Sequence, residues 1–197
     1  MAQDRGKTKK LALLQISIKN ISFLEENLSP PEIIDLIDKV YSKIKNIIKN
    51  KGAYLYKFTG SCFYIIFSDI EDSQDKLENS FYTTKEIFEK LKKHNNFLEM
   101  NHIPKLEYSM VLDYGNIIVG KVKYDETELT ILLGTPFKVV ERATILNEGK
   151  NITPLILTEG IYNKIKPILS EYLITTMGSV KIYNKDVYLY GSYQFNK

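Results

Sequence analysis

The sequence has few cysteine and histidine side chains, the usual nucleophiles and zinc ligands of enzymes. Among 197 residues there is one cysteine, Cys62, and there are two histidines, His94 and His102. A single thiol rules out a disulfide framework and a thiolate zinc cluster, and two histidines are too few for most zinc enzymes. Lysine supplies almost all the positive charge, since Arg5 and Arg142 are the two arginines. An arginine at 142 therefore indicates a need for a planar, multi-donor fork.

Composition and charge describe an ordinary folded domain. The chain is 44% hydrophobic and 26% charged, with a net charge of +3. This balance supports a full core and argues against nucleic acid as a partner bound through bulk charge. No apolar run approaches the roughly 20 residues of a membrane span, and residues 1–10 lack a signal-peptide core. We therefore expect a cytoplasmic domain over residues 10–197, preceded by an N-terminal tail, residues 1–9.

Apolar periodicity predicts alternating strands and helices. Ser29, followed by two prolines and Glu32, is a strong helix start, because serine caps well and Glu32 occupies the capping-box position. We expect helices at 30–51, 73–94, 134–149 and 158–168, and strands at 10–18, 53–58, 62–67, 105–112, 116–122, 129–133, 154–157, 179–182 and 187–193. This order predicts an α+β fold, with a mixed sheet and helices on one face.

Several connecting segments receive specific predictions. Thr59-Gly60-Ser61 and Asp113-Tyr114-Gly115 are each expected to turn a hairpin, and the segment through Glu25 and Glu26 is expected to be a loop. Asp69, Asp72 and Asp75 are expected to be a charge group at a loop and helix N-terminus rather than metal ligands.

Five stretches resemble, in order, the catalytic domain of class III adenylate and guanylate cyclases. They are 15–22, Lys57-Phe58-Thr59-Gly60-Ser61, the glycine-bracketed 111–120, the turn and helix at 134–142, and 177–190. The resemblance covers residues 10–194. It implies the ferredoxin-like fold of that family and a relation to the conversion of ATP or GTP into a cyclic nucleotide.

Two departures from the family pattern concern the metal ions. In active members two aspartates hold two magnesium ions, and the matching positions here are Ser17 and Ser61. Neutral hydroxyls cannot replace the two carboxylates that hard divalent ions need. We therefore expect no metal site in the isolated chain, and magnesium or manganese only if a partner supplies the carboxylates.

The nucleotide-contacting positions are partly kept. The resemblance places Lys57 at the purine-reading lysine, Lys138 at a ribose-orienting asparagine and Arg142 at the transition-state arginine. The alternatives are a solvated lysine at 57 and a helix-surface ion pair at 142. Ile131 falls on the second purine reader and cannot hydrogen-bond a base, whereas Thr130, one residue away, could after a register slip.

These observations favour a degenerate cyclase homology domain, silent alone, that acts as a dimerising or regulatory partner in cyclic-nucleotide signalling. One alternative is a partner-dependent adenylate or guanylate cyclase subunit, which would bind ATP or GTP. Another is a degenerate diguanylate-cyclase-type domain. We expect a homodimer, or a heterodimer with another cyclase-like chain, formed near the 113–115 hairpin and the polar arm at 123–128.

Overall fold

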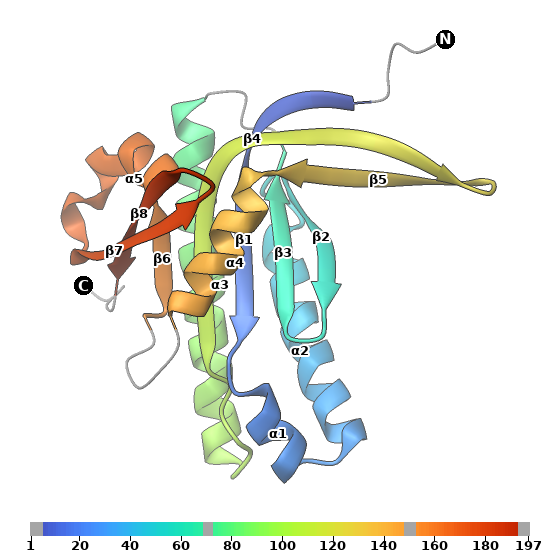
Figure 1. Cartoon of the computed structure of the whole chain (residues 1–197). Helices are drawn as coiled ribbons and strands as arrows, with labels where there is room; N and C mark the ends of the chain where they lie inside the picture. Colours follow the sequence, from blue (N-terminus) through green and yellow to red (C-terminus); the bar gives the residue numbers. More distant parts are fainter. Residues whose placement is uncertain (1–5, 69–72, 148–152, 193–197) are drawn as a thin grey trace.

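The computed structural model describes residues 6–68, 73–147 and 153–192. Eight strands form one mixed sheet in the order β2-β3-β1-β4-β6-β8-β7, and β5 pairs with β4 outside this path (Figure 1). The strands are β1 Gly6–Ile18, β2 Ala53–Thr59, β3 Cys62–Phe67, β4 Tyr108–Tyr124, β5 Thr127–Gly134, β6 Leu155–Thr158, β7 Ile174–Ile182 and β8 Lys185–Ser192. The helices are α1 Ile21–Asn27, α2 Pro30–Ile48, α3 Gln74–Met100, α4 Thr135–Leu146 and α5 Glu159–Ile165, followed by a 3-10 helix, Lys166–Glu171.

The antiparallel pair β1–β4 forms the centre of the sheet. Its register is continuous from Gly6 opposite Gly120 to Ile18 opposite Tyr108. Residues 6–9, expected to belong to a tail, therefore lie in a strand. The turn expected at 113–115 is wrong, because β4 passes through these residues and Asp113 lies opposite Leu13.

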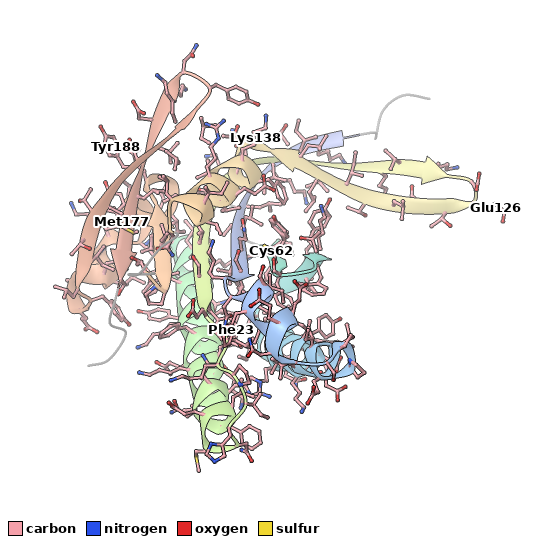
Figure 2. All side chains as sticks on the ribbon, turned by 60° about the horizontal axis from the view of Figure 1, so that its bottom comes forward. Phe23, Cys62, Glu126, Lys138, Met177 and Tyr188 are labelled. Carbon is pink, nitrogen blue, oxygen red and sulfur yellow. The ribbon has the colours of Figure 1, made fainter. Side chains whose placement is uncertain are left out.

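The hairpin turn lies farther along the chain, at the tip of a long arm. β4 and β5 pair from Ile117 opposite Gly134 to Tyr124 opposite Thr127, and Asp125 turns the chain with a φ of 52°. The arm extends away from the body of the molecule, and Glu126 marks its far end (Figures 1 and 2). The polar arm expected at 123–128 is thus the tip of this hairpin.

Helices cover both faces of the sheet, unequally. The larger core joins alternate residues of β1, among them Leu14 and Ile16, to α1, α2, α3 and α5. The smaller core joins Leu11 and Leu13 to α4 and to the β7–β8 hairpin. The α+β fold with a mixed sheet is confirmed. The expectation of helices on one face holds for four helices, whereas α4 packs on the other face.

Local signals account for several elements. In the capping box of α2, the Ser29 amide and hydroxyl lie 2.8 and 2.6 Å from Glu32 Oε2, as expected. Gly60 has a φ of 56° in the two-residue turn between β2 and β3. The segment through Glu25 and Glu26 is the short helix α1, not a loop. Within the described ranges, no helix is both long and apolar enough to cross a membrane.

Asp113 is a buried carboxyl at the middle of the sheet, 5% exposed. The Thr158 hydroxyl donates a hydrogen bond to its Oδ1. Gly160 brings the first turn of α5 close, since a Cβ there would lie 2.6 Å from the Tyr114 carbonyl oxygen. Burial raises the pKa of Asp113 from 3.8 to about 6, against smaller lowering effects of the hydrogen bonds from Thr158 and from the Tyr114 backbone.

The raised pKa makes ionised Asp113 a cost to the fold. The penalty is absent below pH 3.8, grows as the pH rises towards 6 and is complete above that, where it amounts to about 3 kcal/mol. Asp113→Asn keeps an acceptor for Thr158 and removes the charge. We expect it to raise the free energy of unfolding at pH 8 more than at pH 5, measured by urea denaturation. The exposed Asp186→Asn is the control, and an Asp113→Asn effect independent of pH would contradict the assignment.

Candidate functional site

A cleft of about 750 Å³ opens on the α4 face of the sheet. Both Ser17, at the end of β1, and Ser61, in the β2–β3 turn, line it. The two positions that the family resemblance assigns to metal-binding aspartates are therefore brought into one cavity. The other polar side chains around it include Gln15, Cys62, Glu107 and Glu141.

Neutral groups surround Ser17. Gln15 is buried and donates from Nε2 to Ser17 Oγ at 3.0 Å. Cys62 Sγ lies 3.3 Å from Ser17 Oγ and 3.8 Å from Ser61 Oγ. Gln15 lies beside Ser17 because alternate residues of β1 share a face. Cys62 lies beside it because the two are opposite each other in the β1–β3 register.

This donor set does not fit a divalent metal ion. Magnesium is usually held through carboxylates, and its octahedral geometry leaves little freedom. Ser17 Oγ already accepts a hydrogen bond from the Gln15 amide and contacts a thiol. Among the residues that the structure describes, no cluster of three His, Cys, Asp or Glu side chains could hold a metal.

Of the three aspartates weighed as a charge group, Asp75 lies in the first turn of α3, and Asp69 and Asp72 lie outside the described residues.

The Glu141 carboxylate, which also lines the cleft, has a hydrogen-bond partner of its own. Glu141, on α4, accepts a hydrogen bond from the Tyr64 hydroxyl at 3.3 Å. Burial and the charge of Glu141 raise the pKa of Tyr64, so the phenol stays a donor. Lys19 donates from Nζ to the Thr144 carbonyl oxygen at 3.2 Å, which joins the end of β1 to α4.

Lys57 is exposed on β2, where a bulge interrupts the register between Leu55 and Lys57. Lys57 lies opposite Tyr64, a residue of the α4-side core, so it shares the face of the sheet that carries the cleft. Tyr56, the bulged residue, packs towards the same core. Its hydroxyl accepts a hydrogen bond from the Leu132 amide at 3.0 Å, which ties β2 to the base of the arm.

Lys138 and Arg142 point to the β7–β8 hairpin. They lie one turn apart on α4, and neither lines the cleft. The Lys138 ammonium contacts the Tyr183 hydroxyl and lies 4.5 Å from the centre of its ring. Arg142 donates from Nη1 to the Lys181 carbonyl oxygen. The expected alternative, an ion pair of Arg142 on the helix surface, is replaced by this backbone contact; Figure 2 shows Lys138 on α4 beside the hairpin.

The second purine position depends on which way β5 faces. Leu132 belongs to the α4-side core, and side chains alternate along a strand. Thr130 therefore shares the face of Leu132, whereas Ile131, opposite Gly120, lies on the other. Of the two residues weighed from the sequence, Thr130 lies on the α4 face of the sheet and carries a hydroxyl.

Gln15, Cys62 and Glu141 were not identified from the sequence. Gln15 could have been found from the alternation along β1, since it stands two residues before Ser17. Cys62 could have been found only with the β1–β3 register, and Glu141 only with the placement of α4.

The sequence matches the family described as the adenylate and guanylate cyclase catalytic domain over residues 4–131. Since this match covers more than half of the chain, the chain belongs to that family. A comparison with curated proteins found no match. The family match leaves the diguanylate-cyclase-type alternative without support.

Solved structures agree with this fold. The adenylyl cyclase CyaB from P. aeruginosa is 18% identical with a TM-score of 0.83, over 98% of this chain and 97% of that one. The guanylyl cyclase Cya2 is 14% identical with a TM-score of 0.79, over 95% and 93%. A bacterial light-regulated adenylyl cyclase is 20% identical with a TM-score of 0.77, over 96% of this chain and 53% of that one. At these identities the likeness concerns the fold.

Restoring the two carboxylates tests the role of the serines. We expect the double variant Ser17→Asp, Ser61→Asp to bind Mn²⁺, because two acidic groups would then meet in one cleft. The measurement is Mn²⁺ binding by electron paramagnetic resonance. We also expect little cyclase activity, since Ile131 and Lys138 still depart from the purine and ribose positions.

The matched control is Ser17→Asn with Ser61→Asn, which has the same shape and no charge. Equal Mn²⁺ binding by both double variants would contradict the assignment. Rapid cyclisation by the aspartate variant would show that Ile131 and Lys138 are misaligned with the family's positions or unimportant.

Proposed function

We propose that this chain is a cyclase domain that is catalytically silent alone and acts as a dimerising or regulatory partner in cyclic-nucleotide signalling. The observation that carries the proposal is the neutral network of Gln15, Ser17 and Cys62. It occupies the place where the family resemblance puts two metal-binding carboxylates. The proposal locates the chain in the cytoplasm, where ATP and GTP are available.

The arm supports a dimerising role. Ile118 lies opposite Leu133, and Val122 opposite Leu129, so these four side chains share one face of the arm. They are 41–56% exposed. On the other face Lys121 pairs with Glu128 at 2.8 Å. An apolar stripe opposite a charged face is typical of a surface that a second chain covers.

A solved relative supports the same role. A structure titled as a non-canonical dimeric guanylyl cyclase domain, of the RhoGC fusion protein from Blastocladiella emersonii, is 16% identical with a TM-score of 0.72, over 94% of this chain and 97% of that one. The proposed partner is a second copy of this chain or another cyclase-like chain.

A second candidate is a subunit of a partner-dependent adenylate or guanylate cyclase. Lys57, on the cleft face of the sheet, and exposed Thr130 favour it, because they keep hydrogen-bonding groups for a purine. The partner would then supply the carboxylates for magnesium or manganese, and Arg142 would exchange its contact with the Lys181 carbonyl oxygen for a phosphate. ATP or GTP would bind between the two chains.

The purified chain should make no cyclic nucleotide from ATP or GTP with magnesium or manganese. The loss of metal charge stabilisation should cost several powers of ten in rate. The measurement is cyclic-nucleotide formation by mass spectrometry. Turnover that Arg142→Ala or Lys57→Ala abolishes would overturn the silent-domain proposal.

The partner-dependent candidate has its own measurement. An active cyclase-like chain is first given Arg→Ala at its own transition-state arginine, so that it keeps its metal carboxylates and loses activity. Recovery of turnover on mixing with this chain, and none with its Arg142→Ala variant, would support a catalytic partnership. Without recovery, the role of this chain is regulatory or structural.

The apolar stripe should hold the dimer together. A stable interface buries roughly 1,200–2,000 Å² in total. We expect Val122→Ser with Leu129→Ser, or deletion of residues 123–128, to shift the protein to monomer in analytical ultracentrifugation. Lys123→Gln, on the opposite face, is the control and should keep the dimer. A wild-type chain that is monomeric at high concentration would contradict the homodimer and leave the heterodimer.

A further inference from the structure

A second cavity lies between α2 and α3, on the opposite side of the sheet from the cleft. It has a volume of about 470 Å³. Both helices belong to the larger core, whereas the cleft opens on the α4 face. Its lining includes Lys43, Asn46 and Asn50 from the α2 side, and Lys90 and Lys93 from α3. We call it the lysine groove.

The acidic residues of the lysine groove are already engaged. Glu86 pairs with Lys51 at 3.4 Å, and Glu89 pairs with Lys85 at 3.8 Å. Within residues 6–68, 73–147 and 153–192, none of Lys43, Lys90 and Lys93 forms an ion pair. Three lysines that have no ion-pair partner among the described residues therefore line one hollow.

Burial and the charges of the lysines lower the pKa values of neighbouring groups. The pKa of Lys43 is lowered by its burial and then by the charges of Lys90 and Lys39. His94, which is 5% exposed, has a pKa lowered to about 4 by its burial and then by Lys43 and Lys39. Its buried Nε2 has no hydrogen-bond partner among the described residues. An anion in the groove would relieve the repulsion between the lysines.

We propose that the lysine groove binds an anion with two or more phosphoryl groups. Lysine binds phosphate as a compact point charge, and the amides of Asn46 and Asn50 add neutral donors. Several lysines lining one hollow suit a ligand whose charge is spread over more than one phosphoryl group. The groove is separate from the cleft, so this proposal does not rest on the function proposed above.

Two sources could supply this chemistry, and binding measurements separate them. One arm uses pyrophosphate with the full chain, by isothermal titration calorimetry. The other arm uses phosphatidylcholine vesicles with and without phosphatidylinositol bisphosphate, in a sedimentation assay. We expect binding in one arm, which identifies the source, and weaker binding as salt screens the charges.

The double variant Lys43→Gln, Lys90→Gln should weaken that binding at least about tenfold, because two charge-assisted contacts are lost. The control Lys92→Gln, Lys123→Gln removes the same charge outside the groove and should bind like the wild type. Circular dichroism checks that both variants fold. No binding in either arm, or equal loss in both variants, would overturn the proposal. Binding untouched by the groove variant would overturn it too, because the ligand would then sit elsewhere.

Discussion

The continuous antiparallel pairing of β1 with β4 is the constraint on which the rest of the structure depends. It fixes which residues of β1 face α1, α2, α3 and α5 and which face α4. Leu14 and Ile16 enter the larger core, and Gln15 and Ser17 therefore line the cleft. A shift of the register by one residue would exchange the two sets and bury the cleft residues among the helices. The position of the site is thus a consequence of strand pairing.

Much of the fold follows from local patterns. The helix beginning after Ser29 and the hairpin at Gly60 are predicted because capping and turn residues determine them locally. A turn is wrongly predicted at 113–115 because aspartate and glycine close together are typical of turns. In the fold the Asp113 carboxyl finds a partner in Thr158, 45 residues away. α1 is missed because a seven-residue helix has too few turns to show a period.

The candidate site is predictable to a similar extent. Ser17 and Ser61 are found from the family resemblance, and they do meet in one cavity. What fills the space around them depends on pairing between strands, which brings Cys62 opposite Ser17. The contacts of Lys138 and Arg142 with the β7–β8 hairpin join residues about 40 positions apart, and no local pattern encodes them. Which face of β5 carries Thr130 and which carries Ile131 can be predicted only once the position of the turn in the arm is known.

The hydrogen bond from the Leu132 amide to the Tyr56 hydroxyl has a mechanical consequence. It joins Leu132, at the base of the arm, to Tyr56, the bulged residue directly before Lys57. A chain bound to the arm would therefore also act on β2, the strand that carries Lys57. Binding at the arm and the position of Lys57 would then be coupled through this hydrogen bond.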